Sequence, residues 1–497
     1  MERKPEIKTV SLRTETAYKA DEPGKVAQHT DAQGSGSEVN AEVAQLQFAF
    51  LSGEIPQAQA EREVSRGHST PQVRGGEPEP DRCHSTTDPQ PAAQTPNGRA
   101  VALEELDGNH GEAQVNLLEQ ILSRENMLSA WKRVKANKGA AGMDGMSTDA
   151  FPEFARQHWE RIRSALERGT YRPAAVLRVM IPKATGGQRP LGIPTVLDRV
   201  IQQAIAQVIG PLFDPHFSTH SYGFRPQRSA RMALEEMEQA HGDGLRFAVD
   251  CDLKSFFDTV NHGLLMNRLL RKVHDKRVLR LISRYLNAGV ILPDGKREPT
   301  PCGVPQGGPL SPLLANVMLD DLDKELERRE LRFARYADDF LIFVRSRSAA
   351  QRVLRSVGQF IEGKLALIIN RTKSKAARLG ECTFLGFTMS RGKLRWTDAA
   401  VQRFKERVRE ITNRSNGKSM RQRIPILRRY VTGWLNYYGH SRSYTQLLEL
   451  DQWLRRRVRL CYWKQWKRPR TRRRHLMALG ISKDTVKLAS RSRKGYW

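Results

Sequence analysis

The sequence predicts an α+β fold in three parts: a disordered acidic extension, a region of short helices and antiparallel strands, and a helical, strongly basic region. Strands are predicted within residues 332–344, where two apolar runs are rich in aromatic and β-branched residues. A further strand is predicted at residues 247–253, where apolar and polar side chains alternate. Beyond residue 398, apolar residues recur every three or four positions, which is the spacing of one helix face.

Residues 1–112 form the predicted disordered extension. They are rich in Gly, Pro, Gln, Ser and Thr, contain few aromatic residues, and carry 11 Lys and Arg against 19 Asp and Glu. Such a segment cannot bury enough apolar surface to offset the entropy that is lost on ordering. We therefore expect it to remain mostly disordered.

Mixed short helices and strands are predicted from there to Phe387. In chain order, the patterns predict two helices at 117–122 and 127–135, a strand at 171–181 leading to a hairpin at 185–188, an amphipathic helix at 197–208, and a helix at 313–319. The helices predicted in the basic region include residues 401–411 and 426–434.

Positive charge is concentrated at the C-terminal end. The 497 residues include 83 Lys and Arg against 54 Asp and Glu, a formal net charge of +29, and residues 391–497 alone have 30 against 6. Arg residues mix with Trp and Tyr between Trp453 and Arg474, which suits phosphate contacts together with stacking on exposed bases. A polyanionic partner is therefore expected, although a helix with core Trp and solvated Arg would contain part of the same mixture.

Two other classes of protein fit less well. A basic domain on a membrane surface is the competing interpretation, but the chain has no apolar run of about 18 residues and no signal peptide, so no membrane partner is expected. Five cysteines are scattered without a Cys-x-x-Cys pair or a nearby His cluster, which predicts neither a zinc finger nor a disulfide framework. A reducing cytoplasm is the expected location.

Four aspartates are the candidate catalytic residues. Asp338 and Asp339 fall at the turn of a predicted hairpin, where adjacent carboxylates repel each other unless a cation lies between them. A solvated turn is the alternative, because Asp is common in turns. Asp250 and Asp252 lie on the polar face of the strand at 247–253, and either could supply a third carboxylate.

A Gly- and Pro-rich loop at residues 301–312 precedes a predicted helix. Glycine allows a backbone to approach a ligand without steric cost. The loop is therefore a second candidate part of the site.

Three segments, taken in order, resemble the palm of a reverse transcriptase. They are Asp252-Leu-Lys-Ser-Phe-Phe-Asp258, Pro305-Gln-Gly-Gly-Pro-Leu-Ser-Pro312 and Tyr336-Ala-Asp-Asp339. Further blocks make the sequence most similar to bacterial group II intron-encoded reverse transcriptase–maturases: Gln188-Arg-Pro-Leu-Gly-Ile-Pro194, Ser221-Tyr-Gly-Phe-Arg-Pro226, Ile369-Asn-Arg-Thr-Lys-Ser-Lys375, Phe384-Leu-Gly-Phe387 and Gly433-Trp-Leu-Asn-Tyr-Tyr-Gly439. The resemblance runs from about Leu117 to the C-terminus.

The resemblance implies a right-hand polymerase architecture. Residues 113–390 would form the fingers and palm, residues 391–470 the helical thumb or maturase-specific (X) domain, and residues 471–497 a short basic nucleic-acid-binding tail. The Cys and His set of an endonuclease is absent from the sequence. The sequence therefore looks most similar to the endonuclease-less class C lineage.

The resemblance also implies the metal ligands. Asp252, Asp338 and Asp339 match the family's catalytic carboxylates, which hold two Mg²⁺ ions, with Mn²⁺ as a substitute. Asp250 shares a face with Asp252 and stays an alternative ligand.

Residues around the incoming nucleotide are implied in the same way. Lys183 and Arg189 match the pair that closes on the β- and γ-phosphates, Gln306 the contact to sugar or base, Phe257 the gate against a ribose 2′-hydroxyl, and Lys373 the lysine near the leaving phosphate. Lys375 is an alternative to Lys373. Phe256 and Phe257 are equally compatible with ordinary core positions.

The implied function is RNA-directed DNA polymerisation, in which dNTPs are added to a primer 3′-hydroxyl, together with binding of intron RNA for splicing and retrotransposition. The implied partners are group II intron RNA, a DNA target or primer and dNTPs, and a homodimer is one possible assembly. One alternative is a domesticated reverse transcriptase in DNA repair or defence. Another is an RNA chaperone with a vestigial polymerase site, against which the complete carboxylate set argues.

Overall fold

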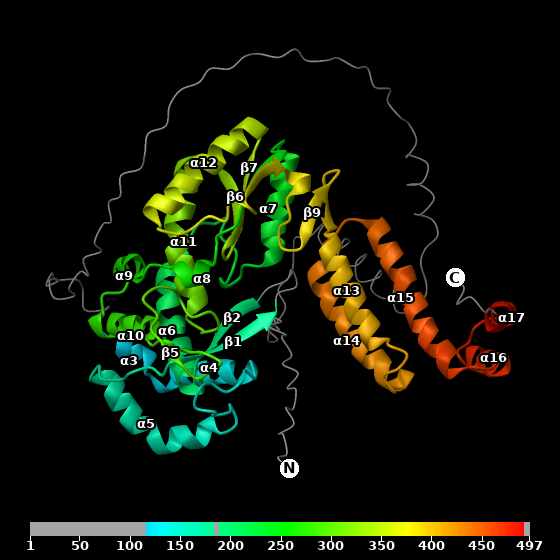
Figure 1. The fold of residues 1–497 in the computed structure, drawn as a ribbon, viewed down its shortest axis with the longest axis horizontal. Helices are drawn as coiled ribbons and strands as arrows, with labels where there is room; N and C mark the ends of the chain where they lie inside the picture. Colours follow the sequence, from blue (N-terminus) through cyan, green and yellow to red (C-terminus); the bar gives the residue numbers. More distant parts are fainter. Residues whose placement is uncertain (1–115, 183–187, 492–497) are drawn as a thin grey trace, which may run out of the picture. The chain divides into compact units, whose positions relative to one another are not determined.

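The structure is a computed structural model of the chain, and it describes residues 116–182 and 188–491 (Figure 1). The predicted disordered extension and the hairpin tip that carries Lys183 lie outside these described residues.

A four-stranded sheet forms the palm. Its order is β6 (Arg332–Tyr336), β7 (Asp339–Val344), β3 (Phe247–Cys251), β8 (Lys375–Arg378), and every neighbouring pair is antiparallel. The antiparallel sheet predicted from the strand patterns is thus present. In Figure 1, α12 (Arg347–Lys364) and α7 (Ala230–Gly242) lie beside these strands, and α11 (Ser311–Arg328) also contacts β6.

Burial of apolar side chains stabilises the palm strands β6, β7 and β3, whereas the edge strand β8 is more exposed. Phe333, Phe340 and Phe343 are at most 2 % exposed, and the last five residues of β7 are all buried. Burial of one such side chain contributes about 1.5–3 kcal/mol. The continuous apolar run in β7 therefore reflects a central strand that is covered on both faces.

The fingers contain a second sheet and three N-terminal helices. The sheet order is β2 (Gln188–Ile193), β1 (Val176–Pro182), β4 (Val290–Ile291), β5 (Arg297–Glu298), and its β1–β4 pair is parallel. The helices are α3 (Leu117–Ile121), α4 (Arg124–Ala136) and α5 (Phe151–Glu167). The first two confirm the predicted helices.

The strand predicted at 171–181 begins only at Val176. The backbone N–H groups of Thr170 and Tyr171 both donate to the carbonyl of Ala165, at distances of 2.8 and 3.0 Å, and so close the end of α5. These donors are therefore not free to enter a strand ladder.

The amphipathic helix predicted at 197–208 is α6 (Val196–Phe213). It begins where the Thr195 side chain accepts a hydrogen bond from the Asp198 N–H, which is an ordinary helix cap. The helices that connect fingers and palm are α8 (Phe256–Thr259), α9 (His262–Leu270) and α10 (Lys276–Leu286).

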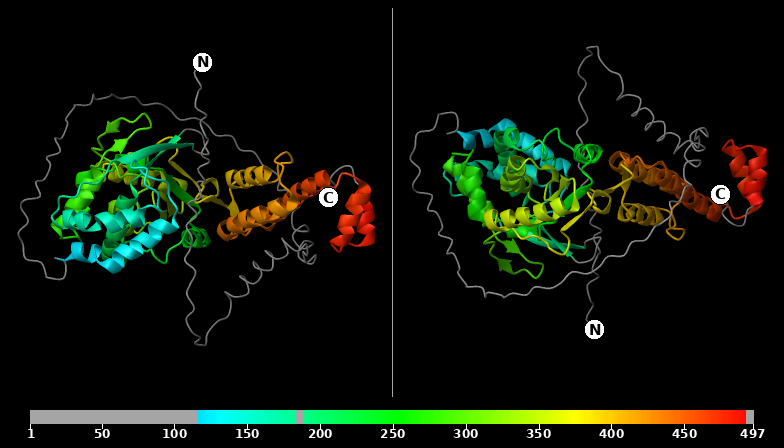
Figure 2. Two further views of the ribbon diagram at one scale, coloured as in Figure 1. Left: turned by 90° about the horizontal axis from the view of Figure 1, so that it is seen from below. Right: turned by 90° about the horizontal axis from the view of Figure 1, so that it is seen from above.

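A hairpin and three helices follow the palm. The hairpin pairs β9 (Phe387–Ser390) with β10 (Lys393–Trp396), and the helices are α13 (Asp398–Ile411), α14 (Met420–Tyr438) and α15 (Tyr444–Gln465). Both views in Figure 2 show these orange helices side by side, and α13 contacts each of the other two. Their core includes Phe404, whose ring centroid lies 4.6 Å from that of Trp434.

The segment predicted as a short basic tail contains two packed helices, α16 (Pro469–Ala478) and α17 (Lys483–Arg491). Leu476, Val486 and Ala489 form a small core against Trp463 and Trp466. The expected domain boundary at 470 thus falls inside α16, and the boundary at 390 falls inside the β9–β10 hairpin. Among the described residues, no helix is long and apolar enough to cross a membrane.

Candidate active site

The Tyr336–Asp339 segment is a two-residue hairpin turn between β6 and β7. Tyr336 pairs with Asp339 in the antiparallel ladder, so Ala337 and Asp338 are the two loop residues. Ala337 has a φ of +61°, a conformation that L-residues adopt only at some cost. The turn thus puts Asp338 at its tip and Asp339 at the first position of β7, as the hairpin prediction required.

Arg335, whose side chain is completely buried, holds the turn by hydrogen bonds. Its Nη1 donates to the carbonyl of Ala337 and to Asn316 Oδ1, both at 2.9 Å. Its Nε and Nη2 donate to the two carboxylate oxygens of Asp323 at 2.7 and 2.5 Å, and Nη2 also donates to Ser221 Oγ at 2.7 Å. One guanidinium therefore ties the strained turn to α11 and to the segment that begins at Ser221.

That segment, 221–226, lies along the outer edge of β6. The Arg335 N–H donates to the carbonyl of His220, and the Tyr222 N–H donates to the carbonyl of Arg335, at 2.9 and 2.8 Å. Gly223 faces the turn so closely that a Cβ would overlap the backbone of Tyr336 and Ala337. Glycine is therefore required here for close packing against the Tyr336–Asp339 turn.

The two upstream aspartates lie at the end of β3, which is paired with β7. Asp250 Oδ2 is 3.9 Å from Lys375 Nζ, and Asp252 Oδ2 is 3.8 Å from Lys373 Nζ. Asp252 Oδ2 also accepts a hydrogen bond of 2.8 Å from Asn370 Nδ2. The two lysines that the sequence left as alternatives thus each face a different aspartate.

The four aspartates form a site with excess negative charge. Burial raises the pKa of Asp250 and of Asp338, and a nearby carboxylate raises each further. For Asp339, burial and the carboxylates of Asp250, Asp338 and Asp252 raise the pKa to about 7. These shifts show that the protein alone does not fully compensate the carboxylates.

The carboxylate groups at this site are of the chemical type that binds a divalent cation. Carboxylate oxygens are the ligands that hard cations such as Mg²⁺ prefer, and uncompensated buried carboxylates favour cation binding. Within the described ranges, no group of three Asp, Glu, His or Cys side chains is already gathered as a ligand shell. Asp252 and Asp250 each lie within 4 Å of a lysine instead.

Phe256 and Phe257 differ in their environment, although their rings are only 5.1 Å apart. Phe256 is 2 % exposed and belongs to the core, whereas Phe257 is only partly buried. The Val304 N–H donates to the Phe257 carbonyl at 2.6 Å. Phe257 therefore lies next to the Gly/Pro-rich loop.

The Gly/Pro-rich loop joins the palm to the fingers. The Gly192 N–H in β2 donates to the Gln306 carbonyl at 2.7 Å, and Ser311 Oγ donates to the Pro305 carbonyl at 2.6 Å. Gly307, at a φ of +120°, packs directly on the Gly192 carbonyl. The loop thereby positions β2, the strand that carries Arg189.

Arg189 is exposed. Its positive charge opposes part of the rise in the pKa of Asp338 that burial causes. Arg189 therefore lies within electrostatic reach of the Tyr336–Asp339 turn, while Lys183 lies outside the described residues.

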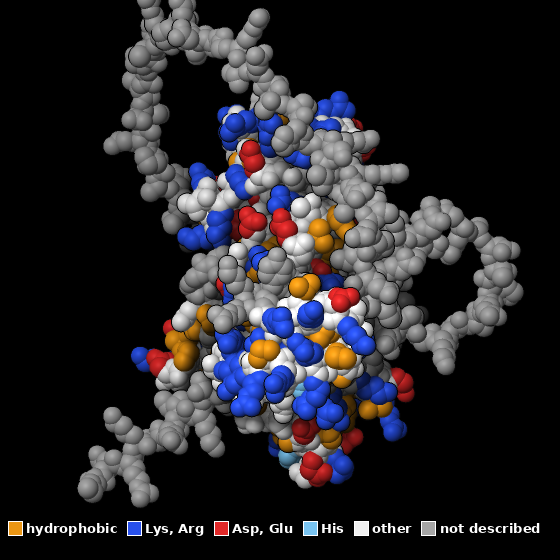
Figure 3. All heavy atoms as spheres, turned by 90° about the vertical axis from the view of Figure 1, so that its right-hand side faces the viewer, with side chains coloured by type: hydrophobic (Ala, Val, Ile, Leu, Met, Phe, Trp, Pro, Cys, Tyr) orange, Lys and Arg blue, Asp and Glu red, His pale blue; other side chains and the backbone are white. Residues whose placement is uncertain are grey.

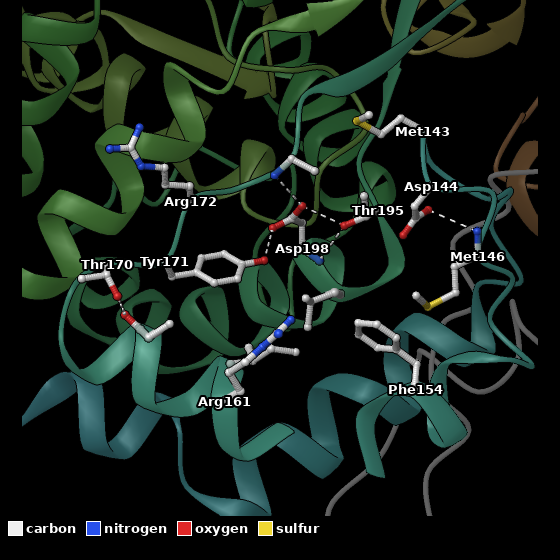
Figure 4. Close-up of a pocket in the computed structure, with 14 residues that line it drawn as sticks. Met143, Asp144, Met146, Phe154, Arg161, Thr170, Tyr171, Arg172, Thr195 and Asp198 are labelled. Atoms are coloured by element: carbon white, nitrogen blue, oxygen red, sulfur yellow. Dashed lines mark hydrogen bonds between the residues drawn. The ribbon is translucent and has the colours of Figure 1, made fainter. Parts of the chain in front are cut away.

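A cavity of about 570 Å³ lies in the fingers rather than at the aspartates (Figure 4). At its wall, buried Asp198 accepts hydrogen bonds from Thr195 Oγ1, from Tyr171 Oη and from the Ala174 N–H, at 2.7, 2.8 and 3.2 Å. None of the predicted site residues that the structure describes lines this cavity. Asp198 therefore acts as an internal tie between α6 and the segment that follows α5.

Sequence reasoning missed the residues that support the aspartates. The pairing of Arg335 with Asp323 could not be recognised in the sequence, because it joins a strand to a separate helix that precedes it in the chain. The available signal was a lone Arg inside the apolar strand 332–336, where a charge must have a partner. Asn370 lies in a block that the sequence resemblance had already marked.

Carboxylates at the turn and at the end of a central strand of an antiparallel sheet, with Arg189 of β2 nearby, are the arrangement expected of a nucleic-acid polymerase. Residues 181–389 match the reverse transcriptase (RNA-dependent DNA polymerase) family, and residues 401–480 match the group II intron maturase-specific domain. The chain belongs to the group II intron-encoded reverse transcriptase–maturases, and its enzymatic activity is that of a divalent-metal-dependent RNA-directed DNA polymerase.

Several curated proteins are similar to this chain. Protein YkfC of Escherichia coli is 32 % identical over 326 residues, which cover 57 % of this chain and 85 % of that protein. The group II intron-encoded protein LtrA of Lactococcus lactis is 36 % identical over 228 residues, covering 46 % of this chain and 38 % of LtrA. The chain therefore matches well under half of LtrA. A putative COX1/OXI3 intron 1 protein of Saccharomyces cerevisiae is 30 % identical over 223 residues, covering 45 % and 26 %.

The buried Arg335–Asp323 pair generates a stability prediction. Asp323→Ala should lower the free energy of unfolding by about 3–5 kcal/mol, because it leaves a buried guanidinium without its carboxylate. Urea denaturation followed by circular dichroism measures the change. Glu167→Ala is the matched control, since it removes the partner of exposed Arg163 and should cost less than about 1 kcal/mol. Equal effects of the two substitutions would contradict the structural importance of the pair.

Proposed function

We propose that this protein copies RNA into DNA at the palm aspartates and binds a group II intron RNA through its basic helices to assist splicing and retrotransposition. The observation that carries the proposal is the partly buried aspartate cluster on the Tyr336–Asp339 turn and β3, with raised pKa values and a family match on both domains. The maturase-specific domain favours this function over a domesticated role in DNA repair or defence.

We assign the metal ligands to Asp252, Asp338 and Asp339, holding two Mg²⁺ ions for which Mn²⁺ can substitute. When bound, such ions lower the pKa of a primer 3′-hydroxyl and neutralise charge on the triphosphate. The chain's own task is to keep three carboxylates within reach of each other in a partly buried setting. The 3.8 Å approach of Lys373 to Asp252 supports this assignment, because a positive charge there limits repulsion among the carboxylates before an ion binds.

We assign the nucleotide contacts as the resemblance implies. Arg189 and Lys183 would bind the β- and γ-phosphates, Gln306 the sugar or base, and Lys373 the leaving phosphate. The influence of Arg189 on Asp338 and the 3.8 Å approach of Lys373 to Asp252 support two of these roles. The partial exposure of Phe257, next to buried Phe256, supports its role as a gate.

The basic helices supply the surface for RNA. Figure 3 shows Lys and Arg side chains gathered with apolar side chains on one face of the molecule. Not every arginine is available there. Arg455 forms an ion pair with Asp451 at 2.7 Å, and Arg457 donates to Thr412 Oγ1 at 3.1 Å. In α14, by contrast, Arg421, Arg428 and Arg429 are exposed and form no hydrogen bond or ion pair within the described part of the chain.

The remaining partners follow from the reaction. A DNA primer or target and dNTPs would meet intron RNA at the palm, and a homodimer stays one possible assembly. We expect the protein in the bacterial cytoplasm, associated with the nucleoid through its nucleic acids.

The polymerase assignment is tested on the aspartates themselves. Asp338→Asn and Asp252→Asn should each reduce primer extension on an RNA template by roughly a hundredfold or more, because each removes a charged metal ligand. Asp250→Asn is the matched control and should cost less than about tenfold. The assay is single-nucleotide extension in Mg²⁺ with folded proteins. Wild-type extension by Asp338→Asn would refute the assignment, and a greater loss in Asp250→Asn would move the ligand to that residue.

The nucleotide gate is tested at Phe257. Phe257→Ala should increase ribonucleotide incorporation relative to dNTPs, because it removes the ring that would clash with a 2′-hydroxyl. Phe256→Ala should instead destabilise the palm by roughly 3–5 kcal/mol through lost burial. Competitive extension with mixed nucleotides measures the first effect and denaturation the second. Unchanged discrimination in folded Phe257→Ala protein would show that the ring only packs.

RNA binding is tested on exposed α14 arginines. Replacing Arg421, Arg428 and Arg429 by Ala should weaken intron RNA binding and flatten its salt dependence by about one unit of slope per lost phosphate contact. Filter binding across a salt series measures both quantities.

The charge-matched control for this variant replaces Arg156, Arg163 and Arg231, each of which pairs with a glutamate on its own helix. Extension on a short unstructured template should change little in either variant. Equal weakening of RNA binding by both triple variants would mean that net charge, not α14, binds the RNA.

A further inference from the structure

The segment 370–374, which leads into β8, folds around the backbone of Asp252. The Asn370 N–H donates to the Asp252 carbonyl at 2.8 Å, and the Asp252 N–H donates to Ser374 Oγ at 3.0 Å. The N–H groups of Lys373 and Ser374 both donate to the Asn370 carbonyl, at 3.1 and 2.8 Å, and so close a turn. One short segment therefore holds the Asp252 backbone through both its N–H and its carbonyl.

The side chain of Asn370 also contacts the Asp252 carboxylate. Asn370 Nδ2 donates a hydrogen bond of 2.8 Å to Asp252 Oδ2, and Lys373 Nζ lies 3.8 Å from the same oxygen. The other carboxylate oxygen, Oδ1, has no hydrogen-bond or ion-pair partner among the residues that the structure describes. Because a hydrogen bond to an ionised acceptor is stronger than one between neutral groups, the Asn370 amide restricts how the carboxylate can turn.

A third residue fixes the orientation of the Asn370 amide. Thr372 Oγ1 donates to Asn370 Oδ1 at 2.7 Å. The reversed amide would place its oxygen against the Asp252 carboxylate, where two acceptors would face each other without a proton between them. The amide oxygen therefore accepts from Thr372, and Nδ2 is left to donate to Asp252.

Asp250 has no comparable donor. Its carboxylate lies 3.9 Å from Lys375 Nζ, and within the described part of the chain no hydrogen bond holds it. Lys375 Nζ also donates to the Glu381 carbonyl at 2.7 Å, so this lysine is shared with a backbone group. An oriented amide donor thus distinguishes Asp252 from Asp250.

We propose that Asn370 is a positioning residue for Asp252: its side-chain amide, oriented by Thr372, holds the carboxylate in the orientation that binds a divalent cation. The proposal deepens the proposed function, because it rests on the assignment of Asp252 as a metal ligand. Hydrogen-bond partners behind a ligand reduce the freedom that the ligand loses when an ion binds. Lys373 approaches the same oxygen, but its exposed, flexible side chain can move to a phosphate, whereas the amide stays in place.

Binding of Mn²⁺ to the full chain, followed by electron paramagnetic resonance without nucleotide, tests this role. Asn370→Ala should weaken Mn²⁺ binding about tenfold, as expected for a group that supports a metal ligand. Asn287→Ala is the matched control, because the Asn287 amide donates a bond of the same length, 2.8 Å, to the Ser283 carbonyl. This control should leave Mn²⁺ affinity unchanged.

A second variant acts at an exposed position and does not remove the amide. Thr372→Val deletes the hydroxyl that orients Asn370 and should weaken Mn²⁺ binding about twofold to fivefold, within the range of one lost hydrogen bond. Its control is Thr388→Val, since the Thr388 hydroxyl donates at 2.9 Å to the Gly380 carbonyl. Combining Thr372→Val with Asn370→Ala should add no further loss, because the hydroxyl acts through the amide.

The two upstream aspartates separate positioning from a general loss of structure. In an Asp252→Asn background, Asn370→Ala should add no further loss of Mn²⁺ affinity, whereas in an Asp250→Asn background it should keep its full effect. In Asn370→Ala alone, the Mg²⁺ concentration for half-maximal extension should rise by the same factor as the Mn²⁺ dissociation constant. At saturating Mg²⁺, kcat should approach the wild-type value.

Contrary outcomes overturn this inference without touching the polymerase. They are unchanged or tighter Mn²⁺ binding in Asn370→Ala, equal weakening in Asn287→Ala, and an effect of Asn370→Ala that persists in the Asp252→Asn background. If Asn370→Ala does not fold, Thr372→Val decides, and wild-type Mn²⁺ affinity in that variant overturns the inference. A wild-type protein that neither binds Mn²⁺ nor loses extension in Asp338→Asn would overturn the proposed function itself.

Discussion

The structure depends on holding several carboxylates close together in a partly buried site, where little water screens the repulsion between them. Polymerase chemistry needs several carboxylates close together, and burial raises the pKa of Asp250, Asp338 and Asp339. The turn that carries Asp338 is held by the completely buried guanidinium of Arg335, which forms an ion pair with Asp323. That pair fixes the strained turn through the Ala337 carbonyl, and so defines where Asp338 lies.

The supports for this turn come from segments that lie far apart in the chain. Gly223 packs against one side of the turn, and Asn316 of α11 accepts a hydrogen bond from the same Arg335 guanidinium that holds it. Asn370 and two lysines hold the upstream aspartates. The motif blocks that seem independent in the sequence are therefore parts of one electrostatic arrangement.

The basic C-terminal helices show why composition overstates the charge available for RNA. Some of their arginines serve the fold: Arg423 is buried and donates to the Lys418 carbonyl at 2.8 Å, and Arg457 contacts Thr412. Exposed residues such as Arg428 remain free to meet phosphate. A nucleic-acid surface and a helical core thus share the same residue type.

The sequence by itself determined the antiparallel strands, the hairpin position of Asp338 and Asp339, the amphipathic helices and the family, because periodicity and short motifs are local properties. It left Asp250 and Asp252 as alternatives, and it described as a tail the segment that forms α16 and α17. Only the tertiary structure paired Lys373 and Lys375 with different aspartates, and only it brought Asp323 to Arg335 and Gly223 to the turn. The reason is physical: burial and charge compensation depend on contacts between residues distant in the chain, and no local pattern encodes those distances.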